Sequence, residues 1–359
     1  MIQEEIWTRE KLVQLKPAPA DNRIYCQVKE IWDKVAKPLD GLGRFEEFIA
    51  QIGAVTGSVE IDIRKKAVIT MCADNGIVEE GVSQSGQEVT RLVAVSMGRQ
   101  ESSVGKMAAC AGADVIPVDI GINSDERISG VRDCKVRKGT RNFLKEPAMT
   151  EAETLEAVSV GIRLCSECKE KGFCLLGTGE MGIGNTTTGS AVTAALTGCD
   201  AQTVTGRGAG LSDAGLERKQ EVIAQALAKY PVNTMDALQI LSVFGGLDIA
   251  GMAGVCIGGA IYHIPVVLDG VISMAAALAA ERMVPGVRAY LLPSHMSREP
   301  AAEKIAAELG LHPVIDAGLA LGEGTGAVMM FQLLDTAFAL YQSRTTFDKI
   351  ELEQYQRLS

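Results

Sequence analysis

Aromatic residues and long apolar runs are both scarce in this sequence of 359 residues. Phe, Trp and Tyr together make up 4%, whereas hydrophobic residues make up 47%, so Ala, Gly and Val provide most of the core. The apolar stretch VISMAAALAA (271–280) is far shorter than the roughly 20 residues of a membrane helix. The N-terminal MIQEEIWTREKLV lacks the apolar segment of a signal peptide. The sequence therefore predicts a globular protein with no membrane partner.

Basic residues are fewer than acidic ones, with 35 Lys and Arg against 45 Asp and Glu. The formal net charge is −10 and the pI is about 5.0, which argues against nucleic acid as the main partner. A locally basic pocket for one small anion remains compatible with this balance. The nine cysteines are odd in number and follow no regular spacing, as expected for reduced thiols. We therefore expect a cytoplasmic location and no nucleic acid partner.

Metal-binding patterns are missing as well. Cys165 and Cys168 form a C-x-x-C pair, but the three histidines supply no matching ligand motif. Asp74 ends a predicted strand, yet no second carboxylate is placed to chelate Mg²⁺ with it. We predict no metal site, and two helical cysteines at 165 and 168.

Apolar runs that end in polar or glycine-rich loops alternate with helical periodicity after the first 60 residues. Strands are predicted at 65–76, 113–122, 173–180, 201–210, 264–273 and 288–297, and helices at 90–110, 151–171, 215–229, 247–260, 274–283 and 300–309. Continuous apolar strands separated by helices are typical of a parallel sheet. We predict an α/β fold, with a parallel, Rossmann-like sheet covered by helices on both faces.

Both ends of the chain are predicted to be helical. CQVKEIWDKVA and RFEEFIAQIGAVTG have apolar residues three or four positions apart, and 325–343 forms one long helix. We expect residues 62–325 to form a large substrate-binding α/β domain. Residues 1–61 and 326–359 would then combine into a small helical domain.

Polar loops follow the predicted strands, and such loops meet at one edge of a parallel sheet, where ligands bind. The loop LLGTGEMGIGNTTT supplies four candidates for binding an anion, because glycines let backbone N–H groups turn inward. They are Gly179, Gly182, Asn185 and Thr186. Asn and Thr also cap helices, and capping is compatible with anion binding.

A second loop, TGRGAGLS (205–212), places Arg207 between Gly206 and Gly208. Taken alone, this pattern suits a phosphate site and a tight strand-to-helix turn equally well. Lys219 lies far enough along the next predicted helix to point back at a phosphate. The loop SHMSRE (294–299) adds hydroxyl groups, and the chain has no G-x-S-x-G motif that would mark a hydrolase nucleophile.

Two carboxylates stand inside glycine-rich loops. Glu323 in LGEGTGAV has glycine on both sides and gains little packing or helix support there. Glu180 lies in the loop GTGEMG. Paired carboxylates serve general acid–base catalysis or displacement at a sugar C1 carbon. A glycoside hydrolase and a glycosyl transferase both fit this pair.

These loops, in this order, resemble the nicotinate-nucleotide–dimethylbenzimidazole phosphoribosyltransferase family of cobalamin biosynthesis. The resemblance spans roughly residues 37–330 and includes the blocks KPLDGLGRFEEF, CADNGIVEEGVS, GTGEMGIGNTTT, GRGAGL, FGGLDIAGMAG, PVVLDGVISMAAAL, PSHMSREP and LGEGTGA. It implies transfer of phosphoribose from nicotinate mononucleotide to 5,6-dimethylbenzimidazole, with inversion at C1′. It also implies a homodimer that needs no cofactor.

The resemblance implies roles for individual residues. Glu323 is expected to be the general base that takes the N–H proton of the benzimidazole, and Glu180 to lie near the ribose. Ser85 and Leu321 are expected to bind the acceptor base. The expected nucleotide- and phosphate-binding residues are Gly179, Gly182, Asn185, Thr186, Gly206, Arg207, Gly208, Lys219 and Ser297.

Four segments depart from the family pattern, and three interpretations of the function remain open. One departure is that residues 87–93 are less polar than in some members, which bears on the choice of acceptor. PLDGLG stands where many members have PPGSLG, Asn75 where some have histidine, and Ala320 where many have arginine. A different acceptor (adenine, another benzimidazole or a phenol) fits the same donor site, because one methyl group changes discrimination by only about 1–3 kcal/mol. A non-catalytic nucleotide-binding subunit is the third reading, although it would have no need of Glu323.

Overall fold

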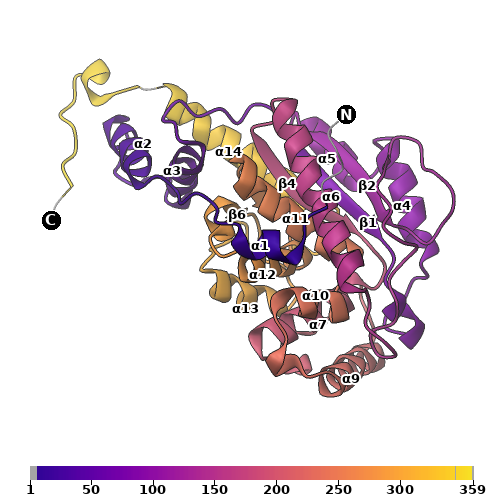
Figure 1. The fold of residues 1–359 in the computed structure, drawn as a ribbon. Helices are drawn as coiled ribbons and strands as arrows, with labels where there is room; N and C mark the ends of the chain where they lie inside the picture. The colour runs from indigo at the N-terminus through magenta and orange to yellow at the C-terminus, as the bar shows by residue number, and fades with distance from the viewer. Residues whose placement is uncertain (1–5, 344, 358–359) are drawn as a thin grey trace.

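The computed structural model describes residues 6–343 and 345–357, and a six-stranded sheet forms its centre (Figure 1). All strand pairs are parallel, and the order across the sheet is β3-β2-β1-β4-β5-β6. The strands are β1 (Lys66–Ala73), β2 (Asp114–Gly121), β3 (Arg132–Asp133), β4 (Leu175–Met181), β5 (Val266–Leu268) and β6 (Leu291–Pro293). The predicted α/β fold with a parallel, Rossmann-like sheet is confirmed.

Fourteen α-helices are found in the described part of the chain. They are α1 (Arg9–Gln14), α2 (Asn22–Lys34), α3 (Arg44–Thr56), α4 (Glu88–Gly98), α5 (Ser103–Cys110), α6 (Glu151–Glu170), α7 (Asn185–Thr197), α8 (Ala201–Val204), α9 (Asp213–Lys229), α10 (Ala237–Phe244), α11 (Leu247–Tyr262), α12 (Val271–Met283), α13 (Ala301–Leu309) and α14 (Thr325–Ser343). Short 3-10 turns are η1 (Gly76–Glu80), η2 (Val232–Thr234), η3 (Val287–Tyr290) and η4 (Phe347–Ile350). None of the described helices has the length and apolarity needed to span a bilayer.

The strand order reverses between β1 and β4. From β1 the chain builds outward through β2 and β3, and then returns to place β4 on the other side of β1. Glu180 pairs in register with Met71 at the carboxyl end of this central pair. In open parallel sheets, the point of reversal leaves a crevice beyond the strand ends that ligands occupy.

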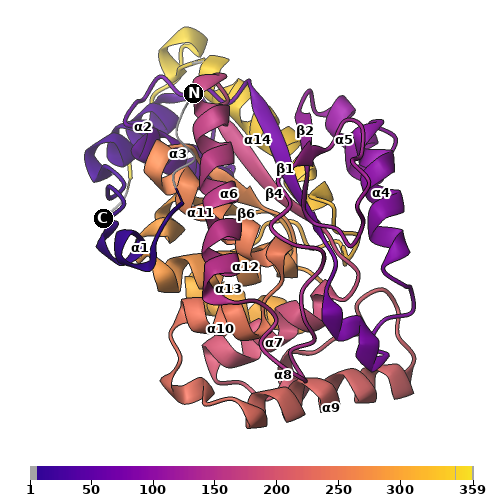
Figure 2. The ribbon, with the colours of Figure 1, turned by 45° about the vertical axis from the view of Figure 1, so that its right-hand side comes forward.

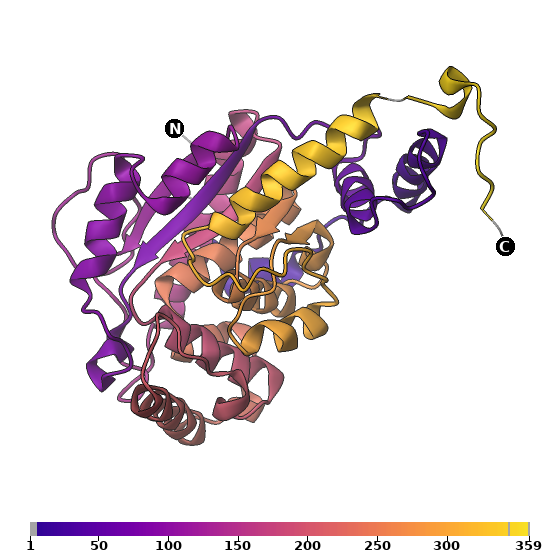
Figure 3. The same cartoon turned by 180° about the vertical axis from the view of Figure 1, so that it is seen from behind.

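Helices cover both faces of the sheet, and alternate side chains of β1 are buried in a separate core on each face. Ala67, Ile69 and Met71 belong to the core that contains α6, α11 and α12. Val68 and Cys72 belong to the core on the opposite face, under α14, α4 and α5. Figures 2 and 3 show these two layers from either side, with α14 running along the face opposite α6 and α11.

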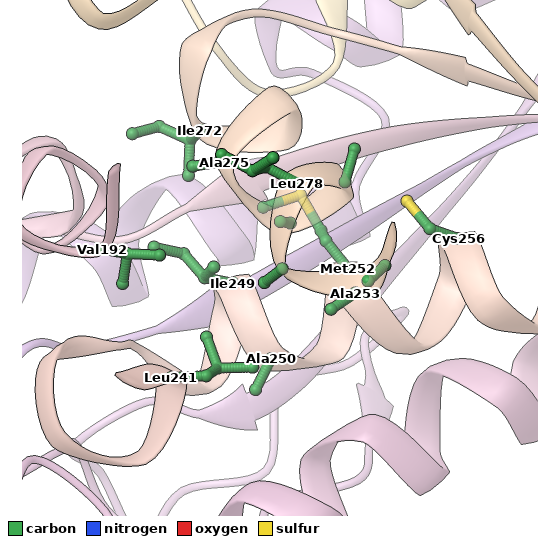
Figure 4. Close-up of a cluster of buried hydrophobic side chains, with 14 of the residues drawn as sticks. Val192, Leu241, Ile249, Ala250, Met252, Ala253, Cys256, Ile272, Ala275 and Leu278 are labelled. Carbon is green, nitrogen blue, oxygen red and sulfur yellow. The ribbon is translucent and has the colours of Figure 1, made fainter. Parts of the chain in front are cut away.

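Four helices on the first face form a core of small and branched residues (Figure 4). Its labelled members come from α7, α10, α11 and α12, and they are Val192, Leu241, Ile249, Ala250, Met252, Ala253, Cys256, Ile272, Ala275 and Leu278. All ten belong to the buried core of the chain. This core holds the N-terminus of α7 at the edge of the sheet.

The helices from the two ends of the chain meet beyond the sheet (Figure 3). Trp32 of α2 packs on Tyr341 of α14 with ring centroids 5.2 Å apart. Leu12 of α1 instead joins the core of α6 and α11, and Arg9 forms an ion pair with Glu151 of α6. The expected division into 62–325 and a small domain of 1–61 with 326–359 stays a prediction.

One predicted strand is wrong. Residues 201–210 form the short helix α8 and a loop, because Asp200 accepts a hydrogen bond from Thr203 N (2.8 Å) and caps the helix. Ala201 and Val204 are buried and the two residues between them are exposed, which is a helical pattern. Three other predicted elements change in extent, and two observed elements were not predicted. The strand predicted at 288–297 shortens to β6, because the 3-10 turn η3 (Val287–Tyr290) precedes it. The helix 90–110 is divided into α4 and α5, the strand 264–273 shortens to β5 because α12 begins at Val271, and α10 and β3 were not expected.

Candidate active site

A cavity of about 210 Å³ opens at the carboxyl edge of the sheet. Its walls come from the loops after β4, β5 and β6, from the loop after α8, and from the segment that precedes α14. Eight of the residues expected at the site line it, namely Glu180, Gly182, Asn185, Thr186, Gly208, Ser297, Leu321 and Glu323. The fold therefore brings together residues that lie up to 143 positions apart (Glu180 to Glu323) in one cavity.

Glu323 is held by hydrogen bonds to two neighbouring strands, one to backbone and one to a side chain. Its N–H donates to the carbonyl of Glu180 (3.2 Å), and its carbonyl accepts from Thr70 Oγ1 (3.1 Å). A Cβ on Gly179 would lie 2.4 Å from the carbonyl oxygen of Glu323, so only glycine lets the loop lie this close to β4. One carboxylate oxygen of Glu323 accepts from Val104 N (3.0 Å), in the first turn of α5.

Glu180 is the penultimate residue of β4 and lies against this loop. A Cβ on Gly322 would lie 2.7 Å from Glu180 Oε1, and Asn185 Nδ2 donates to Glu180 Oε2. Burial raises the pKa of Glu180 to about 8, and the carboxylates of Asp248 and Asp269 add to the increase. This side chain is therefore mostly protonated at neutral pH in the ligand-free protein.

The N-terminus of α7 points toward the cavity. Asn185 and Thr186 are its first two residues, after Gly184 at φ +94°. A Cβ on Gly182 would lie 2.4 Å from the carbonyl oxygen of Ala73, so the turn between β4 and α7 requires a glycine. A helix N-terminus reached through a glycine-rich turn is a favourable site for a phosphate.

Lys219 is buried behind this helix terminus. Its Nζ donates to Thr186 Oγ1 (2.9 Å) and to the carbonyl of Gly206 (3.1 Å). Burial lowers the pKa of Lys219 to about 8, against an opposing effect of the Glu299 carboxylate. The ammonium group thus joins the loop after α8 to α7, and its charge lies close to the cavity wall formed by Thr186 and Gly208.

Five of the thirteen expected site residues do not line this cavity, namely Gly179, Gly206, Lys219, Arg207 and Ser85. Arg207 is exposed, donates to the carbonyl of Leu211 (2.9 Å) and pairs with Asp213. It lines a smaller cavity of about 70 Å³ that adjoins the first at Asn185 and Thr186. Ser85 lies in the loop before α4 and is not among the described residues that line either cavity.

An apolar wall faces the two glutamates. Leu321 leaves 55% of its surface exposed although it lies in the cavity wall, and Val271 and Ile272 of α12 are further apolar residues around the cavity. An exposed leucine beside two carboxylates offers a flat aromatic ring an apolar contact.

The structure adds three charged or titratable residues that sequence reasoning did not select for this cavity. Asp269, His295 and Glu299 line it. Asp269 accepts from Gly324 N (3.1 Å) and Gly326 N (2.7 Å), on either side of the start of α14. Asp269 follows the apolar run PVVL, which is the same signal that drew attention to Asp74.

Asp248 is buried beside the cavity. Its Oδ2 has no hydrogen-bond partner among the described residues, and burial raises the pKa of Asp248 to about 6. Within the described chain, no group of three His, Cys, Asp or Glu side chains is arranged to hold a metal ion. The cavity brings together the N-terminus of α7, an apolar wall and two carboxyl groups, and Lys219 is buried behind Thr186. This combination suits displacement at a phosphorylated sugar.

Comparison with known proteins agrees with this chemistry. The family model described as "Phosphoribosyltransferase" matches residues 18–351. The nicotinate-nucleotide–dimethylbenzimidazole phosphoribosyltransferase of Acetivibrio thermocellus is 45% identical over 324 residues, covering 90% of this chain and 92% of that protein. The protein of the same name from Geotalea uraniireducens is 42% identical over 342 residues, covering 95% and 97%. A solved structure of CobT from Thermus thermophilus superposes with a TM-score of 0.88 at 37% identity, covering 93% of this chain and all of that one.

Proposed function

The chain belongs to the nicotinate-nucleotide–dimethylbenzimidazole phosphoribosyltransferase family, and we propose how its cavity carries out that reaction. The reaction is transfer of the phosphoribosyl group from nicotinate mononucleotide to 5,6-dimethylbenzimidazole, giving α-ribazole 5′-phosphate and nicotinate. The observation that supports our assignment of roles is that Glu323 and Glu180 share one cavity with the phosphate-type site at α7.

In the proposed mechanism, Glu323 is the general base. Its carboxylate takes the proton from one ring nitrogen of the benzimidazole, and the other ring nitrogen attacks C1′ of the ribose. The bond from C1′ to the pyridine nitrogen breaks, and its electron pair leaves with nicotinate. Attack from the face opposite the leaving group inverts C1′. Such a base contributes about 10² to 10⁴ in rate.

The other residues hold the donor in place. The proposed nucleotide-binding set consists of Gly182, Asn185, Thr186, Gly208 and Ser297 in the cavity lining, and of Gly179, Gly206 and Lys219 behind it. Arg207 extends the set through the adjoining cavity. Glu180 is proposed to face the ribose, where positive charge develops. Positioning two substrates in one cavity is worth roughly 7–11 kcal/mol. On this scale, positioning contributes more than the base.

The proposal also covers the acceptor base, the number of chains in the assembly and the cellular location. Leu321 and Ser85 are the proposed acceptor-binding residues, and dimethylbenzimidazole is the proposed acceptor ahead of adenine, another benzimidazole or a phenol. We propose that two chains form a homodimer in the cytoplasm.

An end-point assay by mass spectrometry tests the reaction and the base together. The protein is incubated with nicotinate mononucleotide and an equimolar mixture of dimethylbenzimidazole, adenine and p-cresol. Glu323→Gln is run beside it, with Glu303→Gln, which removes an exposed carboxylate of α13, as the control. We expect nicotinate and one dominant α-ribotide, a loss of roughly 10² or more in rate for Glu323→Gln, and no change for the control.

Two results would contradict the proposal in different ways. A full rate in Glu323→Gln would remove Glu323 as the base and leave the reaction in place. Untouched mononucleotide with all three acceptors would instead favour a nucleotide-binding role without catalysis.

A further inference from the structure

A carboxylate of the chain itself occupies the glycine loop at the proposed phosphate site. Glu299 Oε1 accepts a hydrogen bond from Gly208 N (2.9 Å). A Cβ on Gly206 would lie 2.3 to 2.7 Å from the three atoms of the Glu299 carboxylate group. Glycine at 206 is therefore what leaves room for a negatively charged group at this point of the loop.

The surroundings of this carboxylate are those of an anion site. The buried Lys219 ammonium, bound to Thr186 Oγ1 and the Gly206 carbonyl, interacts electrostatically with Glu299. Ser297 lies two residues before Glu299 and also lines the cavity, and its Oγ accepts from Glu299 N (3.4 Å). The carboxylate of Glu299 thus accepts from the Gly208 N–H, and the Lys219 ammonium and the Ser297 hydroxyl, which also suit a phosphate, lie nearby.

We propose that Glu299 determines donor specificity by holding the phosphate subsite until a phosphorylated donor displaces it. The inference rests on the proposed function, because it takes the donor to be a mononucleotide. A phosphate dianion carries more negative charge than a carboxylate and has three acceptor oxygens, whereas Glu299 accepts a hydrogen bond in this subsite through one oxygen, Oε1. A nucleoside without phosphate cannot displace Glu299, so the subsite stays filled and the nucleoside gains nothing from it.

Binding of inorganic phosphate tests this competition without any turnover. The dissociation constant is measured by ³¹P NMR titration at pH 7 for the wild type, Glu299→Gln and Glu299→Ala. The control is Glu303→Gln, which removes the same charge from an exposed position of the neighbouring helix. We expect Glu299→Ala to bind phosphate roughly tenfold more tightly, the factor that one charge-assisted hydrogen bond is worth.

Glu299→Gln keeps an acceptor for Gly208 N and loses only the charge, so it should lie between the wild type and Glu299→Ala. It also keeps the test valid if the alanine variant is poorly folded. The proposal would be overturned if Glu299→Gln bound phosphate no more tightly than the Glu303→Gln control does.

Kinetics with two donors then separate this inference from the proposed function. We expect Glu299→Gln to lower the KM for nicotinate mononucleotide and to leave kcat/KM for nicotinate riboside unchanged. An equal change in kcat/KM for both donors would overturn the inference and indicate that Glu299 contacts the ribose. If no variant transfers the ribosyl group while Glu299→Gln still binds phosphate more tightly, the proposed function fails and the displacement stands.

Discussion

One residue at the cavity, Glu323, is held in a backbone conformation that few non-glycine residues of the chain adopt. Glu323 has φ +63° and is one of five described non-glycine residues with positive φ, and its neighbours Gly322 and Gly324 also have positive φ. The left-handed conformation costs a non-glycine residue roughly 1–2 kcal/mol. The hydrogen bonds from Thr70 and to the Glu180 carbonyl keep Glu323 there. The fold thus maintains a strained backbone in order to present this carboxylate.

Burial of Glu180 makes the stability of the protein depend on pH. Its pKa is raised from 4.5 to about 8 in the folded chain, so the folded state holds a proton that the unfolded state has lost between these values. The stabilising effect of that proton is fully present below pH 4.5 and is lost as pH rises through 8. We expect Glu180→Gln to have the higher Tm at pH 9 and a similar Tm at pH 5.

Differential scanning fluorimetry from pH 5 to pH 9 measures this difference. Glu303→Gln, which changes an exposed carboxylate, should follow the wild type at every pH. A constant offset between Glu180→Gln and the wild type would contradict the assignment of the raised pKa to Glu180.

At the scale of elements, α14 connects the candidate base to the rest of the fold. Asp269, which follows β5, accepts from Gly324 N and Gly326 N and thereby stabilises the N-terminus of this helix. We expect Asp269→Asn to lower the free energy of unfolding by about 1–3 kcal/mol, because an amide N–H₂ would face a backbone N–H. Urea unfolding measures this loss, and kcat should fall with it because the Glu323 loop loosens.

The exposed Asp316 provides the matched control, since Asp316→Asn removes the same charge without touching the helix. Retention of full stability and full kcat in Asp269→Asn would show that the loop is held by the contacts of Glu323 with Thr70, Val104 N and the Glu180 carbonyl.

Two helices on the first face approach at glycines. A Cβ on Gly254 of α11 would lie 2.1 Å from the carbonyl oxygen of Val158 in α6, and one on Gly161 of α6 would lie 2.1 Å from the carbonyl oxygen of Gly251. Gly254→Ala should therefore destabilise the protein by about 1–3 kcal/mol, as overpacking does. Gly215→Ala in α9, where the three atoms nearest to a Cβ belong to the side chains of Leu211 and Ser212, should be neutral or stabilising by urea unfolding. Equal effects of the two substitutions would contradict a close backbone contact between α6 and α11.

Periodicity predicted the long elements well and the short ones poorly. The helix expected at 325–343 is α14, and the strand expected at 65–76 contains β1 (Lys66–Ala73). Residues 201–204 contain Thr and Val, which favour strands, yet the Asp200 cap and tertiary burial form a helix there. Short elements offer too few residues for a period to outweigh such contacts.

At the scale of the whole molecule, the position of the site followed from the alternation of strands and helices, whereas its electrostatics did not. The carboxyl edge of a parallel sheet is a prediction of topology, and Glu180 and Glu323 do line the cavity there. Two details differ from the prediction. The loop at 205–212 follows a helix instead of a strand, and Ser85 is not among the residues that line the cavity. The approach of Glu299 to Gly208 depends on tertiary packing across 91 positions, for which the sequence carries no local signal.

The proposed homodimer is a prediction about mass. One chain has a mass of 38.1 kDa, so sedimentation equilibrium at micromolar concentration should give twice this value. The wild type and Glu323→Gln should agree, because the candidate base has no part in assembly. A mass of one chain across the concentration range would contradict the dimer.

The length of α14 also gives the molecule an optical probe. Its 19 residues span about 28 Å, from the residue that follows Gly324 to the neighbourhood of Tyr341. Trp32 is one of two tryptophans in the chain, is fully buried, and lies against Tyr341 at the far end of this helix. The part of the tryptophan emission that comes from Trp32 therefore reports on the far end of the helix whose first turn adjoins Glu323. A displacement of the Glu323 loop that carries α14 with it becomes visible in the emission spectrum without any added label.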